Sequence, residues 1–170
     1  MERIGLGGGC HWCTEAVFQS LIGVSKVEQG FIAPKYDPNS FSEAVIVHYD
    51  QNIISLKDLI EIHLLTHKST VLHSMRAKYR SAIYAFNSLS LKESESQLGV
   101  LQKGFSDTIV TALYCFGAFK PSDSRFHNYY YKDPEKPFCE TYISPKLKLL
   151  LDKFSVLVNP NLPSTFHEST

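Results

Sequence analysis

The spacing of apolar positions changes several times along the chain, and each change predicts a different element of secondary structure. Runs that are apolar, β-branched or strictly alternating are typical of strands. Such runs cover residues 3–9, 24–32, 43–50, 79–86 and 108–116. Apolar residues at helical spacing next to capping signals predict helices. These segments are residues 10–21, 55–65, 90–103 and 144–154.

Three of the predicted helices begin with recognisable capping signals. Ser55 and Asp58 have the spacing of a capping box, and Ser90 opens a similar pattern. Ser144 followed by Pro145 suits the N-cap and the first turn of the last helix.

Strands and helices alternate, but their connections are uneven and two strands are neighbours in sequence. This pattern favours a mixed sheet over a doubly wound parallel one. We therefore expect an α+β fold, a two-layer sandwich with a mixed, mainly antiparallel sheet and packed helices. Strand 43–50 is apolar on both faces and is predicted to be central, and strand 108–116 is predicted to be buried. We expect one domain over residues 1–158 and a loose tail over residues 159–170.

Composition and charge exclude several classes of function. The 170 residues include 17 Lys and Arg and 17 Asp and Glu, so the formal net charge is zero. A neutral chain without a basic run is not typical of nucleic-acid binding. No apolar stretch reaches the ~20 residues that a membrane span needs. Because the first glycine motif leaves no room for a signal peptide, we expect a reducing cytoplasm, where four cysteines indicate redox chemistry or metal binding. We also expect a monomer.

The glycine run that ends the first strand leads directly to a cysteine at a predicted helix start. A thiol attacks as the thiolate, and the free N–H groups and dipole of a helix N-terminus stabilise that anion. Cys10 occupies such a position after Gly7, Gly8 and Gly9, which let a substrate approach the backbone closely. The run is not a dinucleotide-binding fingerprint, because Cys10 stands where the third glycine is needed.

Residues 9–15 resemble a known family signature. Gly-Cys-His-Trp-Cys-Thr-Glu is similar to the Gly-Cys-Phe-Trp-Gly-x-Glu motif of the type A peptide methionine sulfoxide reductases. Further blocks follow in family order over roughly residues 3–142. They are Glu43 in its strand, Tyr79-Arg80-Ser81-Ala82-Ile83-Tyr84, and Tyr129 followed by Asp133-Pro134 and Cys139.

The resemblance implies the reduction of methionine S-sulfoxide, free or in proteins. Cys10 would attack the sulfur, and Glu43 would donate a proton to the oxygen. Tyr79 and Tyr36 would hold that oxygen by hydrogen bonds. Methionine leaves, and the Cys10 sulfenic acid condenses with a second thiol to a disulfide. A thioredoxin-like dithiol restores the enzyme, and no metal or organic cofactor takes part.

Substrate recognition and resolution of the sulfenic acid involve further residues. The resemblance implies a recess for the S-methyl group, with Trp12 as one wall and His11 in place of the family's Phe. Tyr129 is a candidate substrate-binding residue that either bonds the sulfoxide oxygen or packs in the core. Two cysteines are candidates for resolution. Cys139, on a late loop, matches the family's common resolving position and is favoured over Cys13, which stands where the family usually has Gly.

Other positions are interpreted as structural or depart from the family. Cys115, within an apolar strand, is expected to be an inert core residue. Lys68 and Ser74 stand where the family has aspartates, which puts substrate orientation and rate in question. His63 and His67 have a spacing that permits zinc binding with the cysteines, but the long gap between the cysteines and the histidines argues against a metal site.

Two other functions are compatible with these residues. One is a dithiol–disulfide oxidoreductase that uses Cys10-x-x-Cys13, although no thioredoxin-like strand pattern precedes the motif. The other is a noncatalytic module that binds methionine or its sulfoxide, suggested by the changes at His11 and Ser74.

Overall fold

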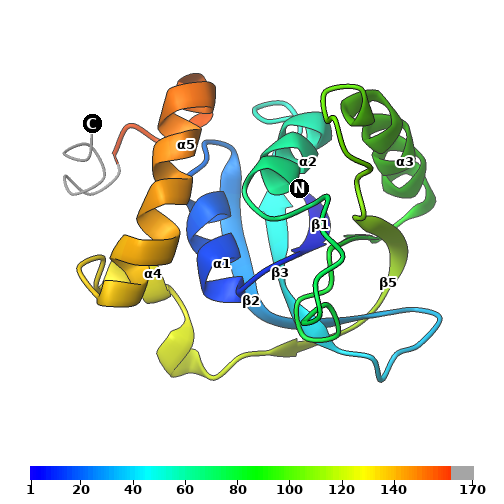
Figure 1. Cartoon of the computed structure of the whole chain (residues 1–170), viewed down its shortest axis with the longest axis horizontal. Helices are drawn as coiled ribbons and strands as arrows, with labels where there is room; N and C mark the ends of the chain where they lie inside the picture. The colour runs from blue at the N-terminus through cyan, green and yellow to red at the C-terminus, as the bar shows by residue number, and fades with distance from the viewer. Residues whose placement is uncertain (162–170) are drawn as a thin grey trace.

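Five strands form one sheet that curls until its two edges meet (Figure 1). The computed structural model describes residues 1–161. The strands are β1 (Glu2–Gly7), β2 (Val24–Pro34), β3 (Ser42–Tyr49), β4 (Ala82–Ala85) and β5 (Ala112–Pro121). Their order is β1-β3-β2-β5-β4, and the pairing of β4 with β1 closes the barrel.

The sheet is mixed and mainly antiparallel, as the sequence predicts. β3 lies between β1 and β2, which confirms its central position. β4 and β5 form the parallel pair, with Ala82 opposite Ala112. Closure of the sheet is not evident from periodicity, because it depends on the twist and curvature of all five strands together.

Helices cover the outside of the barrel in two groups (Figure 1). They are α1 (His11–Gln19), α2 (Leu56–Leu65), α3 (Ser88–Gln102), α4 (Tyr129–Lys132) and α5 (Ser144–Phe154). In Figure 1, α1, α4 and α5 lie on one side, and α2 and α3 lie on the other. Packed helices against a mixed sheet agree with the predicted α+β class.

The two faces of the sheet bury separate apolar clusters. Alternate side chains of β3, including Val45 and Val47, pack with the helices in the larger cluster. The intervening Ala44 and Ile46 join Tyr84 in a smaller cluster on the other face, inside the barrel. A strand that is apolar on both faces is therefore required at this position.

Of the three helix starts predicted from capping signals, one is confirmed and two are wrong. Ser55 caps α2 in a capping box with Asp58, as predicted. α3 begins earlier than predicted, because Asn87 is its N-cap and Ser90 is the reciprocal partner three residues later. Ser144 is not an N-cap, because α5 continues directly from a π-helical turn at Cys139–Ile143.

The prediction of a buried strand at residues 108–116 is wrong in position and in burial. β5 begins at Ala112, and most of its residues are half-buried or exposed. Cys115 is exposed and is not a core residue. β5 lies between β2 and β4, and none of its residues is fully buried, so apolar and β-branched composition overstates its burial.

The end of the described chain is tied to α1. Val158 forms a β-bridge with Leu21, and the Asn159 N–H donates a hydrogen bond to the Ser20 carbonyl at 2.8 Å. Asn159, which the sequence placed in a loose tail, is thus hydrogen-bonded to the end of α1. Residues 162–170 of the predicted tail lie outside the described residues. Among the helices of residues 1–161, none is long and apolar enough to cross a membrane.

We expect Gly5→Ala to destabilise the barrel. A Cβ at Gly5 would lie 2.9 Å from both Ile32 Cδ1 and Tyr84 Cβ, inside the smaller cluster. Overpacking of this kind costs about 1–3 kcal/mol in the free energy of unfolding, measurable by urea denaturation. Gly99→Ala is the matched control, because nothing lies within 4 Å of its Cβ and α3 would gain about 0.5–1 kcal/mol. Equal stabilities of the two variants would contradict this account of the barrel interior.

Candidate active site

Cys10 occupies the N-cap of α1, at the point where the chain leaves β1. The Cys13 thiol donates a hydrogen bond to the Cys10 sulfur, and this contact is the largest cause of a lowered pKa at Cys10. Backbone N–H groups of Trp12 and Cys13 lower the pKa further, while burial and the charge of Glu43 oppose the shift. Cys10 therefore stands at a helix N-terminus, and its thiol ionises at a lower pH than that of an ordinary cysteine.

The other two interior cysteines are held as thiols. Cys13 is 5% exposed, and its role as donor to Cys10 together with burial raises its pKa. Cys139 is fully buried at the start of the π-helical turn rather than on a loop, and burial raises its pKa. Both sulfurs belong to the larger apolar cluster. Cys10 is thus the thiol most ready to ionise.

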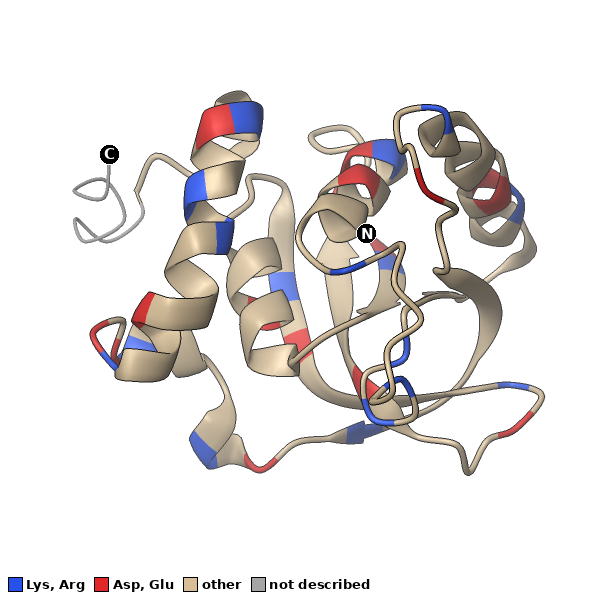
Figure 2. Cartoon of the chain, viewed as in Figure 1, with Lys and Arg blue, Asp and Glu red and all other residues tan. Residues whose placement is uncertain are grey.

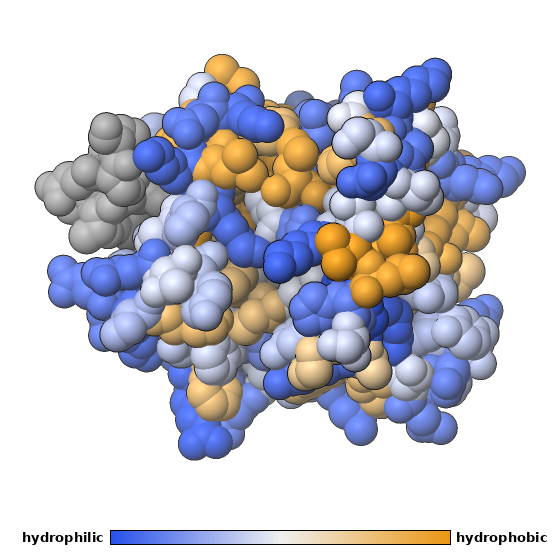
Figure 3. Space-filling model, in the orientation of Figure 1, coloured by the Kyte–Doolittle hydropathy of each residue, from blue (hydrophilic) through white to orange (hydrophobic). Residues whose placement is uncertain are grey.

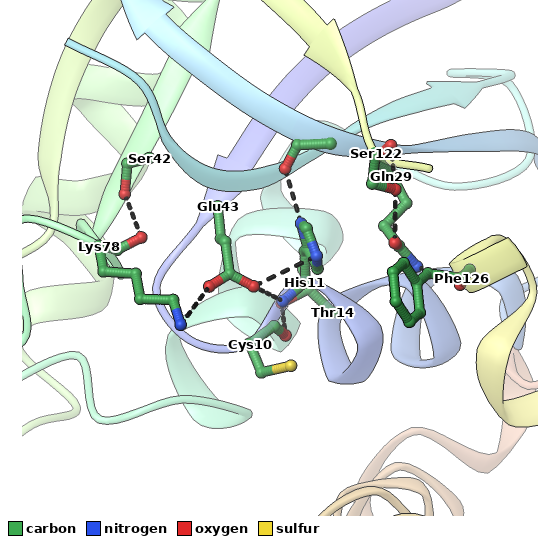
Figure 4. A network of polar contacts seen from close by, with 10 residues as sticks. Cys10, His11, Thr14, Gln29, Ser42, Glu43, Lys78, Ser122 and Phe126 are labelled. Atoms are coloured by element: carbon green, nitrogen blue, oxygen red, sulfur yellow. Dashed lines mark hydrogen bonds and ion pairs between the residues drawn. The ribbon is translucent and has the colours of Figure 1, made fainter. Parts of the chain in front are cut away.

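Glu43 projects from β3 toward the start of α1 (Figure 4). Its side chain is 7% exposed, with Oε1 3.2 Å from His11 Nε2 and Oε2 3.8 Å from Lys78 Nζ. The His11 backbone N–H also donates to Oε1 at 3.5 Å. Figure 4 places this carboxyl directly beside Cys10. A buried carboxyl group and a thiol of lowered pKa therefore share one corner of the fold.

The His11 ring faces Glu43, and it is not among the residues that line the cavity at Cys10. Its Nδ1 lies 2.7 Å from the Gly30 carbonyl, which only accepts hydrogen bonds, so Nδ1 carries a hydrogen. Burial is the main cause of a lowered pKa at His11, so the imidazole is neutral near neutral pH. Nε2 then presents a lone pair to Glu43. The sequence suggested a wall of the substrate recess, whereas the structure gives a buried partner of the carboxyl group.

Trp12 is the centre of an aromatic cluster at the other side of α1. Its ring stacks on Tyr129 with centroids 4.2 Å apart and on Phe126 at 5.3 Å, and it meets the edge of Phe138 at 5.3 Å. Trp12 and Tyr129, both predicted site residues, are thus brought together. Phe138 connects this cluster to the cavity beside Cys10, which it lines.

Glu15 holds the aromatic cluster in place, a role that the sequence reasoning did not assign. The carboxylate is 1% exposed and accepts hydrogen bonds from the N–H groups of Asn128 (3.1 Å) and Tyr129 (3.2 Å). Burial is the largest influence on its pKa, which is raised. The one feature of the sequence that pointed to a role for Glu15 was its place in the same short motif as Cys10 and Trp12.

A cavity of about 670 Å³ opens beside Cys10. It lies between the glycine turn, the segment that follows α2, and the start of α5. Its walls include Gly8, Gly9, Cys10, Cys13, Leu65, Thr66, His67, Lys68, His73, Arg76, Tyr79, Phe138, Tyr142, Pro145, Lys146 and Leu149. Tyr79 therefore shares the cavity with Cys10. Tyr36 does not line it; this side chain is 73% exposed and packs against Tyr114.

The chain around Tyr79 is fixed to β3. The Lys78 carbonyl accepts hydrogen bonds from the Glu43 N–H at 2.9 Å and from the Ser42 hydroxyl at 2.8 Å (Figure 4). The Ser42 hydroxyl in turn accepts from the Arg80 N–H at 2.7 Å. These contacts hold Tyr79 at the same strand end as Glu43.

Arg76 fixes the segment that follows α2, another role that the sequence did not reveal. Its guanidinium donates to the carbonyls of Gly8 (3.0 Å), Tyr79 (2.9 Å), Val71 and Lys68. Ser74, which stands at a family aspartate position, is exposed. Hydrogen bonds from the charged guanidinium to backbone carbonyls thus hold this segment next to the glycine turn.

His63 and His67 lie beneath the cavity with ring centroids 4.2 Å apart. His63 Nε2 contacts the Gly7 carbonyl at 2.7 Å, and His67 Nε2 contacts the Ser81 hydroxyl at 2.8 Å. Burial lowers both pKa values, that of His67 to about 4, so both rings are neutral. Within residues 1–161 no cluster of three or more His, Cys, Asp or Glu suits a metal ion. The pair is engaged in packing and hydrogen bonding.

Comparison with known proteins relates this geometry to one family. The family model described as peptide methionine sulfoxide reductase matches residues 2–156. Peptide methionine sulfoxide reductase MsrA of Acinetobacter baumannii (strain SDF) is 33% identical over 172 residues, covering 93% of this chain and 98% of the relative. The protein of that name from Saccharolobus solfataricus is 33% identical over 168 residues, covering 91% and 95%.

Solved structures agree with the fold. Reduced Mxr1 of Saccharomyces cerevisiae superposes with a TM-score of 0.71 at 22% identity, covering 83% of this chain and 90% of Mxr1. Methionine sulfoxide reductase A of Corynebacterium diphtheriae gives a TM-score of 0.65 at 21% identity, covering 79% and 76%. With the family match over nearly the whole described chain, these findings show that the protein belongs to the peptide methionine sulfoxide reductase family.

Proposed function

We propose that this protein reduces the S epimer of methionine sulfoxide with Cys10 as nucleophile. The observation that carries the proposal is a single thiol of lowered pKa, placed at a helix N-terminus between a buried carboxyl group and an open cavity. Free methionine sulfoxide and the residue in proteins are both candidate substrates. The choice of epimer rests on family membership.

In the proposed reaction, the Cys10 thiolate attacks the sulfoxide sulfur while the oxygen takes up a proton from Glu43. The attack forms a bond between the two sulfurs, and the protonated oxygen passes from the methionine sulfur to the Cys10 sulfur. The S–O and S–S bonds to the methionine sulfur break, methionine leaves, and Cys10 is left oxidised as a sulfenic acid. Tyr79, which lines the cavity with Cys10, is proposed to bind the oxygen. Tyr36 was expected to assist, but it packs against Tyr114 outside that cavity.

The proton on the carboxyl group is supported by its contact with His11. A neutral imidazole with its hydrogen on Nδ1 and an ionised carboxylate would place two lone pairs 3.2 Å apart. One additional proton between Oε1 and Nε2 turns this contact into a hydrogen bond. We infer that Glu43 and His11 share one proton, which supplies the acid for the oxygen. Three other titratable groups interact electrostatically with this pair, namely Lys78, Cys10 and His127.

The S-methyl group is proposed to enter the aromatic cluster. Trp12 and Tyr129 form its stacked centre, and Phe138 belongs to both this cluster and the cavity. An apolar recess beside the nucleophile favours the methyl group over water. His11 faces away from this recess and is not proposed to contact substrate.

Resolution of the sulfenic acid has two candidate thiols. Condensation with a thiol forms the disulfide and releases water. The hydrogen bond from Cys13 to Cys10 favours Cys13 for this step. Cys139, favoured from sequence, is fully buried at the start of a π-helical turn. A thioredoxin-like dithiol would then reduce the disulfide, as is suggested by the structure of yeast Mxr1 in complex with Trx2.

A dithiol–disulfide oxidoreductase remains the second candidate function, because the same Cys13–Cys10 contact suits disulfide exchange. The two functions differ in substrate. Faster reduction of a protein disulfide than of a methionine sulfoxide would favour the second candidate.

We expect Cys10→Ser to abolish dithiothreitol-dependent reduction of methionine S-sulfoxide, whereas Cys115→Ser retains it. Cys115 is exposed and does not line the cavity, so it controls for the loss of a thiol. In the wild type, one equivalent of sulfoxide without reductant should release methionine and consume two thiols. Peptide mapping of the resulting disulfide then distinguishes Cys13 from Cys139. Turnover by Cys10→Ser would refute the assignment of the nucleophile.

Loss of the Cys13 donor should raise the pKa of Cys10. Because the pKa is lowered in the wild type, the thiolate persists to lower pH than in an ordinary cysteine. Cys13→Ala should move the pH midpoint of Cys10 alkylation by iodoacetamide upward by about one unit. Cys13→Ser keeps a hydroxyl donor and should stay close to wild type. Mass spectrometry of the Cys10 peptide follows the reaction, and identical midpoints in all three proteins would exclude the proposed contact.

Replacement of the imidazole should slow the step in which the sulfoxide oxygen takes up a proton. In His11→Phe the Glu43 carboxyl group loses its contact with Nε2, so kcat/KM for methionine S-sulfoxide should fall by about tenfold or more. His48→Phe is the matched control, because His48 Nε2 pairs with Glu28 Oε2 at 2.7 Å on the same sheet, and it should keep the wild-type kcat/KM. An unchanged kcat/KM in His11→Phe would show that the pair does not supply the proton.

A further inference from the structure

The cavity beside Cys10 is lined by cations without carboxylates. Lys68, Arg76 and Lys146 contribute to its walls, and none of the described lining residues is Asp or Glu. Figure 2 shows that the nearby α5 carries more basic than acidic segments. In Figure 3, hydrophilic surface lies in the middle of this face, next to an apolar patch. A neutral chain thus presents a locally positive cavity.

The three cationic side chains differ in exposure and in the hydrogen bonds that they already make within the protein. The Arg76 guanidinium is used by backbone carbonyls. Lys68 is exposed at the rim. Lys146, in the first turn of α5, is half-buried, and its Nζ donates to the Thr66 carbonyl. Over residues 1–161 no ion pair joins Lys146 to a carboxylate.

Lys146 is also close to the reacting sulfur. Lys146, Cys10 and Cys13 line the same cavity. Burial lowers the pKa of Lys146, and negative charge on Cys13 or Cys10 raises it. Lysine is seldom withdrawn from water without a counter-charge, because its desolvation is costly. Proximity to the nucleophile and the absence of a carboxylate partner together indicate that an anionic part of the substrate is bound here.

We propose that Lys146 binds the α-carboxylate of a C-terminal methionine sulfoxide while its sulfur lies at Cys10; this rests on the proposed function. The two groups are separated in the substrate by a short carbon chain, and both Cys10 and Lys146 line the same cavity. Leu65, Phe138 and Leu149 supply apolar wall for that chain. Lys68 at the rim adds positive potential that attracts the anion.

The same lining disfavours the free amino acid. Free methionine sulfoxide carries an α-ammonium next to its carboxylate, and the described cavity walls offer no Asp or Glu to bind it. An N-acylated residue with a free carboxylate, as at the end of a peptide, carries only the anion. The cavity therefore suits the carboxylate of a methionine sulfoxide at the C-terminus of a peptide better than that of the free amino acid.

The test compares N-acetylmethionine S-sulfoxide with its C-terminal amide, which differ in charge and hardly in shape. We expect wild-type kcat/KM to be about tenfold higher for the acid, mainly through KM, as one charge-assisted hydrogen bond allows. In Lys146→Gln the acid-to-amide ratio should fall close to one. Lys148→Gln is the matched control, because Lys148 is exposed on α5 outside the cavity, and it should keep the wild-type ratio.

Each outcome has a distinct meaning. A wild-type ratio near one, or a ratio that survives in Lys146→Gln, would overturn the carboxylate site while leaving the reductase activity intact. Absence of turnover of both compounds by the wild type would contradict the proposed function itself. Free methionine S-sulfoxide is the third substrate. A kcat/KM equal to that of the N-acetyl acid would overturn the preference for a C-terminal residue.

Discussion

The close approach of the glycine turn to its neighbours is the constraint on which the site depends. A Cβ at Gly7 would lie 2.9 Å from the Glu43 carbonyl oxygen, and one at Gly8 would overlap the His67 ring. Only glycine allows the chain at the end of β1 to pass so close to β3 and to the segment that follows α2. Because α1 begins immediately afterwards, this packing places Cys10 beside Glu43 and at the mouth of the cavity.

The local environment then gives the three interior cysteines different pKa values. Cys10 accepts hydrogen bonds and has a lowered pKa, whereas Cys13 donates and Cys139 is surrounded by apolar atoms, so both remain thiols. The buried Glu43 carboxyl group and the His11 ring lie in the same region. The proposed nucleophile, acid and resolving thiols are thus distinguished by environment rather than by residue type.

The substrate side of the site is assembled from segments far apart in the chain. The segment after α2 is held by Arg76, and the start of α5 contributes Lys146 to the opposite wall. Glu15 joins α1 to the Asn128–Tyr129 backbone and so fixes the aromatic cluster. Each of these links joins a charged side chain to main-chain groups, which the one-dimensional pattern of charges does not predict.

The sequence by itself determined the order and type of most elements, the helix-start position of Cys10, and the family, because periodicity, capping residues and short motifs act locally. It overestimated the burial of β5, where Cys115 is exposed, and it placed Cys139 on a loop. Closure of the barrel, the turn of His11 toward Glu43, and the position of Tyr36 outside the cavity were decided by the tertiary structure. The reason is that each depends on which distant backbone or side-chain group comes into contact, and that is set only when the strands pair and the helices pack.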